Sequence, residues 1–314
     1  MNRKISIIMI FLFFIFTTEL LSQSYLFKVL TISGKVDYSL SSGQSWKKVQ
    51  MGESLNRDYK IRLDKNSYTA LMYNDGRTME IQDEGIFEIK DLEQNIINLK
   101  RSVSQKFANF VAQEIITDKS EKKDMKTFAA VVRVRPNHIE SAIPSSTALL
   151  DSIINFSWHS YPSSRKYIIG ILGSAKTTIF MDIVDDSIYT LDASKLNLNY
   201  ETVYKWYVFD ADNPQIISDT NSVILKSLGN KSAILDTLEL LENEFQSNET
   251  PLNRLSLGTF YERNNLNIEA LIEFNKAVSL APESEEYKLF FAKFLLRHKL
   301  YLRASELLED KLNE

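Results

Sequence analysis

The sequence predicts a multidomain protein of the β plus α class, in which two β-rich units precede a helical C-terminal unit. In residues 25–92 and 153–227, short apolar, β-branched or aromatic runs alternate with turn residues, which is typical of strands. From residue 233 onward, apolar residues recur every three or four positions, which is typical of amphipathic helices. A chain of 314 residues is long enough for two or more domains.

The first 22 residues predict a secretory signal peptide. Arg3 and Lys4 precede an apolar run, Ile5–Phe16, and small and polar residues follow it. Because this run is shorter than the roughly 20 residues that span a bilayer, we expect cleavage after Ser22 and no membrane span after cleavage. An uncleaved anchor is the alternative. The expected location of the mature chain is the periplasm or cell envelope.

The composition argues against several classes of function. The net charge of −4 and the pI of about 5.6 do not fit a basic nucleic-acid-binding surface. The absence of cysteine excludes disulfides, thiolate metal sites and cysteine nucleophiles. We therefore expect a protein that relies on side-chain packing for stability and does not bind nucleic acid.

Residues 23–95 predict a small β domain, because turn residues recur about every ten positions. Asp75-Gly76 lies between two apolar runs and predicts a tight hairpin in which the glycine has a positive φ. We expect Trp46 to lie at the centre of this domain. The residues that carry a family resemblance are Val29, Ser33-Gly34-Lys35-Val36, Trp46, Gly52, Leu55, Ile61-Arg62, Ala70 and Asp75-Gly76.

This pattern covers about 70 residues and resembles the FecR domain. The resemblance implies an extracytoplasmic β domain that takes part in protein recognition. The best-known members are transmembrane regulators with a cytoplasmic segment that binds a sigma factor. Here a predicted signal peptide stands in place of that segment, so the resemblance does not imply anti-sigma activity.

Residues 96–150 predict a helix and a charged linker. Seven charges in residues 117–126 indicate an exposed connection. The preceding helix, over residues 105–116, is predicted from apolar residues that share one helical face: Val103, Phe107, Phe110, Val111 and Ile115.

Residues 151–228 predict a β sandwich, because apolar and polar residues alternate along runs that end in turn signals. Aromatic residues expected in its core are Phe156, Trp158, Tyr167, Tyr204 and Trp206. With these aromatics, the unit resembles a fibronectin type III or related immunoglobulin-like domain.

Residues 231–314 predict a stack of helices. Residues at the offsets of a helix–turn–helix repeat are Leu257-Gly258, Tyr261, Ala270, Phe274, Ala277 and Pro282. They resemble the tetratricopeptide repeat, a unit of about 34 residues. In this interpretation Gly258 and Ala270 let two helices approach closely, and Tyr261 and Phe274 fill the space between them. A weaker second repeat is expected in residues 285–314, and helix 233–247 is expected to complete the stack.

Catalytic and metal-binding patterns are not evident. The three histidines, His138, His159 and His298, fall in separate segments without metal-ligand spacing. No Gly-rich phosphate loop and no nucleophile-elbow pattern occur. We therefore expect no catalytic residue, no metal site and no cofactor.

The predicted partner-binding surface is the free face of the first helix in each repeat, which lines the concave groove of such stacks. In the first repeat this face carries Leu252, Leu255, Thr259 and Glu262. In the second it carries Leu289, Lys293 and Leu296. A groove of this kind suits a helix or an extended peptide. The alternative is that Leu252 and Leu255 only pack against helix 233–247.

Three functions follow from these predictions. The leading hypothesis is a non-catalytic, exported envelope adaptor that binds protein or peptide partners through the FecR-like domain and the tetratricopeptide tail. The alternative is a module that binds glycan, including peptidoglycan, through its many aromatic residues. An unrecognised hydrolase is a third hypothesis, which no constellation of residues supports.

Overall fold

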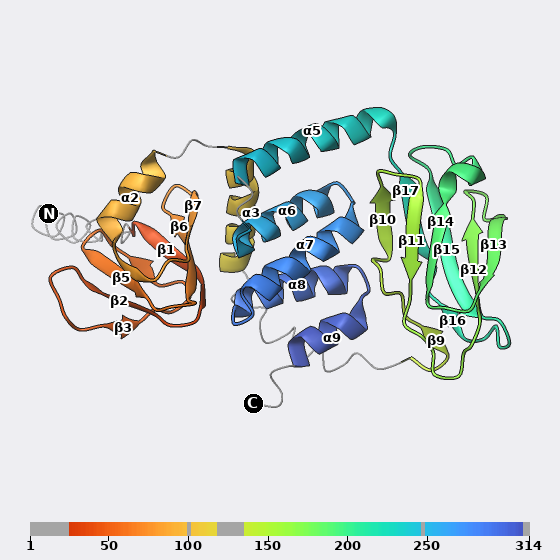
Figure 1. Cartoon of the computed structure of the whole chain (residues 1–314), viewed down its shortest axis with the longest axis horizontal. Coiled ribbons are helices and arrows are strands. Elements are labelled where there is room, and N and C mark those ends of the chain that lie inside the picture. The colour runs from red at the N-terminus through yellow and green to blue at the C-terminus, as the bar shows by residue number, and fades with distance from the viewer. Residues whose placement is uncertain (1–24, 99–101, 118–134, 246–248, 310–314) are drawn as a thin grey trace, which may run out of the picture.

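The structure is a computed structural model that describes residues 25–98, 102–117, 135–245 and 249–309. Figure 1 shows three regions in a row: a first β unit, a helical unit in the middle, and a second β unit at the far end. The helices that end the chain thus lie between two β units that precede them in sequence. The predicted signal peptide at residues 1–22 and the charged residues 118–126 lie outside the described residues.

The first β unit consists of two four-stranded antiparallel sheets, in the orders β4-β1-β6-β7 and β3-β2-β5-β8, followed by helix α2. Apolar side chains from both sheets and from α2 form its core, including Phe27, Ile61 and Leu71. Its elements are β1 (Phe27–Ser33), β2 (Val36–Leu40), β3 (Lys47–Lys48), β4 (Ser54–Leu55), β5 (Tyr59–Leu63), β6 (Tyr68–Tyr73), β7 (Thr78–Ile81), β8 (Gly85–Glu88) and α2 (Ile89–Ile97).

The hairpin between β6 and β7 is confirmed. Gly76 has φ of +93°, its N–H donates to the carbonyl of Tyr73 over 2.9 Å, and β6 and β7 pair on either side of it. The expectation for Trp46 is wrong. Its indole is only half-buried, and the cations of Arg62 and Lys60 lie 4.3 and 5.5 Å from its ring centre. Trp46 precedes the short outer strand β3, so it covers charged side chains at the surface rather than the core.

The helical unit contains α3 (Val103–Thr117), α5 (Leu228–Phe245), α6 (Pro251–Arg263), α7 (Asn267–Leu280), α8 (Glu285–Arg297) and α9 (Tyr301–Glu309). The close approach of α6 and α7 is confirmed, because a Cβ added at Gly258 would lie 2.5 Å from the Phe274 ring. The loops after α6 and α8 are equivalent: Asn265 and Lys299, 34 residues apart, have φ of 60° and 61°. The same helix–turn–helix geometry therefore occurs twice, in α6–α7 and in α8–α9.

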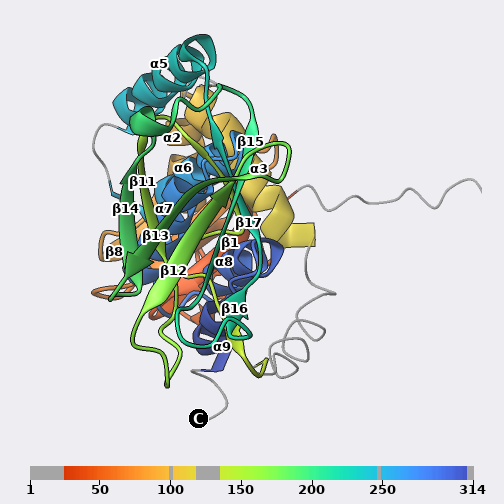
Figure 2. The same cartoon turned by 90° about the vertical axis from the view of Figure 1, so that its right-hand side faces the viewer.

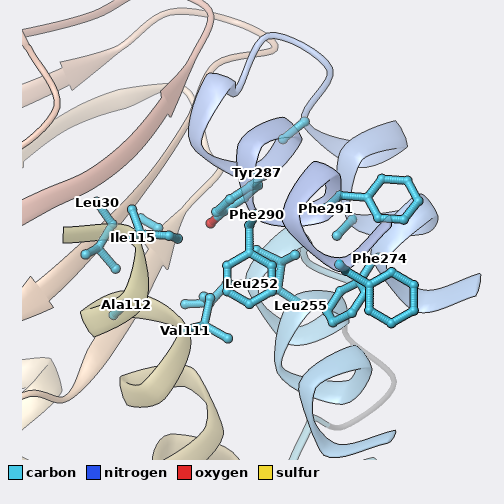
Figure 3. Close-up of a cluster of buried hydrophobic side chains, with 14 of the residues drawn as sticks. Leu30, Val111, Ala112, Ile115, Leu252, Leu255, Phe274, Tyr287, Phe290 and Phe291 are labelled. Carbon is cyan, nitrogen blue, oxygen red and sulfur yellow. The ribbon is translucent and has the colours of Figure 1, made fainter. Parts of the chain in front are cut away.

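Helix α3, which overlaps the helix predicted within residues 96–150, packs as part of the helical unit. It packs beside α6 and α5 and also touches β1 and β7. Figure 3 shows Val111, Ala112 and Ile115 of α3 directed toward β1 and α6. The apolar face predicted for this helix is therefore its packing face, apart from Phe110, which is 39% exposed beneath the Arg263 guanidinium.

The second β unit is a sandwich of a large sheet and a two-stranded sheet, β11-β14. The large sheet has the order β10-β17-β15-β12-β13, and β16 and β9 extend it beside β15. Because β9 and β10 belong here, residues 138–149 are part of this unit rather than of a linker. Its strands are β9 (His138–Ile139), β10 (Ser146–Leu149), β11 (Ile153–Ser157), β12 (Tyr167–Leu172), β13 (Thr178–Val184), β14 (Ile188–Asp192), β15 (Val203–Asp210), β16 (Ile217–Ser218) and β17 (Asn221–Leu225), with a 3₁₀ turn, η2 (Ala193–Leu196).

The five aromatic residues expected in this core are all buried. Phe156 and Trp206 pack with ring centres 4.9 Å apart, and Trp158 meets Tyr167 edge-on at 5.5 Å. These contacts join the two sheets of the sandwich. None of the helices in the described part of the chain has both the length and the apolarity that a membrane span requires.

Candidate functional site: a cavity between the second β unit and the last helix

The groove face predicted on α6 is covered by the chain itself. Leu252, Leu255 and Thr259 are at most 2% exposed. Figure 3 shows Leu252 and Leu255 facing the α3 side chains, with Phe290 beside them. They do not form the core with α5 that the alternative interpretation expected, since their cluster joins α3, α7, α8 and the first β unit. The expected open groove on α6 is therefore filled by α3.

Glu262, the fourth predicted residue of that face, is held in a charged cluster. Its carboxylate accepts hydrogen bonds from Arg297 at 2.9 Å, and His298 Nε2 lies 3.3 Å away. Burial opposes ionisation of this carboxyl, but the hydrogen bond to His298 and the charge of Arg297 outweigh it and lower the pKa of Glu262. Arg297 also lies 3.9 Å from Glu114 of α3. The cluster thus ties α3, α6 and α8 together.

The three residues predicted on α8 are more accessible. Leu289, Lys293 and Leu296 are half-buried, and Leu296 packs against the core that α3 shares with the repeat. The seven predicted residues therefore lie along one side of the α6–α8 layer, but α3 and the first β unit occupy most of it. Binding of an outside partner by these residues stays a prediction.

A cavity of about 640 Å³ lies elsewhere, where the second β unit meets α9. Three segments far apart in sequence form its walls: the chain around β9, the loop between β11 and β12, and the first turns of α9. Its principal side chains are Arg135, His138, Glu140, His159, Tyr161, Tyr301 and Ser305. Cavities of this size, with apolar walls and a few convergent polar groups, are typical of ligand sites.

Glu140 holds the two sides of the cavity together. Its carboxylate accepts a 2.7 Å hydrogen bond from the backbone N–H of Leu302, in the first turn of α9. Its own carbonyl accepts from the N–H of His159 over 2.8 Å. A carboxylate is stabilised at a helix N-terminus, where backbone N–H groups are unpaired. Glu140 therefore fixes both α9 and the β11–β12 loop relative to β9.

Arg135 and His138 form the polar end of the cavity. Arg135 makes two hydrogen bonds to the Asp219 carboxylate, at 3.1 and 3.2 Å, and its guanidinium lies 2.5 Å from His138 Nε2. Burial, and then the charge of Arg135, lower the pKa of His138. The ring nitrogens of His138 thus have partners within the protein, since Nε2 faces Arg135 and the ring also forms a hydrogen bond with the backbone of Ile217.

The polar end of the cavity pairs an imidazole with a guanidinium. A nucleophilic mechanism needs a nucleophile, a base and an orienting group in hydrogen-bond sequence. At the polar end of the cavity, the imidazole instead faces a guanidinium, which cannot accept a proton. Within the described ranges, no three His, Cys, Asp or Glu side chains are placed to hold a metal ion together.

Sequence reasoning missed this cavity. The structure brings His138 and His159 to one site, whereas His298 lies apart, against Glu262 and Phe294. No local pattern connects residues 135–163 with residues 301–306. The one signal was Tyr161-Pro162 in a loop, beside a run of exposed polar residues.

The fold thus defines a mixed β and α protein in which a helical unit lies between two β units. No family model matches the chain. No curated protein matches it significantly. Its similarities to solved structures include the FN1–FN3 domains of chicken CNTN1, with a TM-score of 0.22, 12% identity, 65% of this chain covered and 55% of that chain. The chain spans about half the length of that structure, and this TM-score does not establish a common fold.

Proposed function

We propose that the protein is an exported, non-catalytic adaptor of a bacterial cell envelope, and that it binds an extended segment of a partner protein in the cavity beside α9. The cavity is the observation that carries this proposal. Tyr161, Pro162 and Tyr301 give it apolar walls, and His159 and Ser163 add polar side chains. An extended peptide presents backbone donors and acceptors together with side chains, and both kinds of wall suit it.

The architecture supports this proposal. We infer a FecR-like domain for the first β unit, because its strands and the Gly76 turn follow the predicted order. We infer an immunoglobulin-like domain for the second β unit from its two sheets and its aromatic core. We infer tetratricopeptide repeats for α6–α9 from the 34-residue spacing of equivalent loops. Domains of these kinds are recognition modules.

The structure also indicates which surface of the tail is available. Helix α3 occupies the side of α6 where a repeat of this kind would receive a partner, so that side already has an occupant. No described part of the chain fills the cavity beside α9. We therefore place the main binding site at the junction of the tail with the second β unit.

The test is binding of envelope-derived peptides to the purified protein and to two matched variants. Tyr301→Ala removes one wall of the cavity and should weaken peptide binding by at least about tenfold, which corresponds to ~1.4 kcal/mol. Tyr200→Ala removes a tyrosine that is 53% exposed in a different loop and should leave binding unchanged. Equal affinities for both variants, with unchanged thermal stability, would exclude the cavity.

Glycan binding is the second candidate, because Tyr161 and Tyr301 offer aromatic rings to a sugar at the same site. Sedimentation with purified cell-wall sacculi distinguishes the candidates: a glycan module co-sediments, and Tyr301→Ala abolishes this.

Export is tested separately by the mass of the N-terminal peptide. We expect a mature chain that begins at Gln23, and an intact Met1 on a membrane-bound product would contradict it.

A further inference from the structure

Strand β13 carries an apolar stripe that faces solvent. In an antiparallel sheet with one face on the core, outward side chains are normally polar. Here the alternate residues Ile179, Met181 and Ile183 point outward and are 39%, 50% and 63% exposed. The intervening Phe180 and Val184 pack against the core of the second β unit. The stripe is therefore a true outer face and not a core displaced by a register shift.

The apolar surface continues across the neighbouring strands. On β12, Ile168 pairs with Ile183 of β13, and Gly170 pairs with Met181. On β15, Tyr207 lies directly over Gly170, where an added Cβ would be 2.8 Å from the ring, and it stacks on Phe209 at 6.0 Å. Figure 2 looks onto this end of the molecule, where β12 and β13 lie toward the viewer. A continuous apolar surface of this kind marks an interaction site.

The free edge of β13 is closed to strand addition. Among the described strands, β13 pairs only with β12. The N–H of Ile183 donates to the Asp182 carboxylate over 2.8 Å, and the pairing register shifts beside Ile179. A charged residue and a bulge on an edge strand both prevent another strand from pairing there. Contact with a partner must therefore use the outward side chains.

The charges at the two ends of the stripe are self-complementary. The turn before β13 carries Lys176, and Lys205 lies at the same end of the sheet, beside Leu172. The turn after β13 carries Asp185 and Asp186. Lys166 lies 3.6 Å from Asp185 and compensates it in part, through a pair that is more than half exposed. An antiparallel copy of β13 would bring each basic end to an acidic end.

We propose that this surface binds a second copy of the chain, with the β13 stripes packed face to face about a two-fold axis at Met181. The symmetry pairs Met181 with its own copy and places Ile179 of one subunit against Ile183 of the other. Each isologous contact is made twice, as in most homodimers. Figure 1 shows the first β unit at the opposite end of the molecule from β13, so the dimer leaves that unit accessible.

The test is the mass of the purified protein in solution, measured by sedimentation at several concentrations. The native protein should form a dimer. Met181→Lys places two like charges on the axis and should raise the dissociation constant by at least about tenfold. The matched control is Ile188→Lys on β14, which is 58% exposed in the other sheet and should leave the dimer intact.

Charge exchange tests the orientation. Lys176→Asp alone and Asp186→Lys alone should each weaken the dimer, and the double variant should restore it, because the exchanged charges meet again across the axis. A monomeric native protein would overturn the proposal, even if another protein covered the surface. A dimer that survives Met181→Lys would also overturn it. Unchanged melting temperatures of the variants establish that each is folded.

Discussion

The helical unit meets the two β units through very different contacts. Toward the first β unit it uses side chains: Tyr68 meets Tyr287 at 2.8 Å, and Thr31 meets Ser284 at 2.5 Å. Toward the second β unit it uses loop backbone: the N–H of Ala148 donates to the carbonyl of Asn265, and the N–H of Ser145 donates to that of His298. The first interface has a large continuous apolar core, whereas the second has a smaller apolar cluster around Ala148 and the cavity beside α9.

The strands at the two interfaces account for this difference. The first interface is buried, because β6 is buried along its whole length: Ala70 and Met72 face the helices, and Leu71 and Tyr73 face the core between the two sheets. At the second interface, the carbonyls of Asn265 in the loop after α6 and of His298 in the loop after α8 accept hydrogen bonds from the chain at β10. Ala148 also packs with Leu257, Phe260 and Leu266, so a small apolar cluster accompanies these backbone contacts.

The largest effect is expected at Glu80, which connects β7 to the helical unit. Its buried carboxylate accepts hydrogen bonds from Thr250 Oγ1 at 2.5 Å, Tyr68 at 2.6 Å and the N–H of Leu252 at 3.3 Å. Glu80→Ala removes the acceptor of Thr250 and of the Leu252 N–H and leaves Tyr68 only its contact with Tyr287, so it should lower the free energy of unfolding by about 2–4 kcal/mol. Denaturant titration measures this. Glu84→Ala, at an exposed site of the same unit, should change little, and equal losses would contradict the proposed role.

Gly76→Val should cause the next largest loss of stability. The positive φ of Gly76 disfavours a β-branched residue, and an added Cβ would lie 2.8 Å from Asn109 Nδ2 of α3. We expect a loss of more than about 1 kcal/mol in thermal or denaturant unfolding. Gly229→Ala is the control: nothing lies within 4 Å of that position in α5, and alanine favours helix. A neutral Gly76→Val would show that the hairpin does not depend on this turn.

The pH dependence of stability should report on the first interface through Glu80. Burial raises the pKa of Glu80 despite the hydrogen bonds of Thr250 and Tyr68. A carboxyl with a raised pKa in the folded state contributes stability that is complete below the unfolded value of 4.5 and is lost as the pH rises through the folded value. The stability of the native protein relative to Glu80→Gln should therefore increase as the pH falls from 7 toward 4.5. A difference that does not change with pH would contradict this.

Local sequence patterns predicted local structure, but they did not predict contacts between residues far apart in the chain. Gly76 and the Gly258–Phe274 contact followed from short motifs whose partners lie close in the chain or one repeat away. The docking of the first β unit involves residues more than 200 positions apart, such as Tyr68 and Tyr287. One sequence signal for it was available: residues 68–73 are almost continuously apolar, which is typical of a strand covered on both faces.

The predictions of a central Trp46 and of an open groove on α6 were wrong for a related physical reason. A large aromatic residue can be half-buried as well as central, and here two cations cover it. The apolar stripe of α3 was recognised, but a stripe does not say which surface it will cover. The cavity beside α9 depends on three separated segments, so only the folded chain brings its polar groups together.

The smallest effect is expected at Asn267, whose side chain contributes to the second interface together with the Glu140 carboxylate. Its side-chain amide donates to the carbonyl of Ser146 over 2.7 Å, and its backbone N–H donates to Thr147 Oγ1 over 3.1 Å. Asn267→Ala removes only the first bond, and the carbonyl contacts of Asn265 and His298 remain. We expect a loss of about 1 kcal/mol in the free energy of unfolding. Peptide binding at the cavity should persist, because the backbone of the repeated loops still holds the second β unit in place. A loss as large as that of Glu80→Ala would mean that side chains govern both interfaces, and the contrast between them would no longer hold.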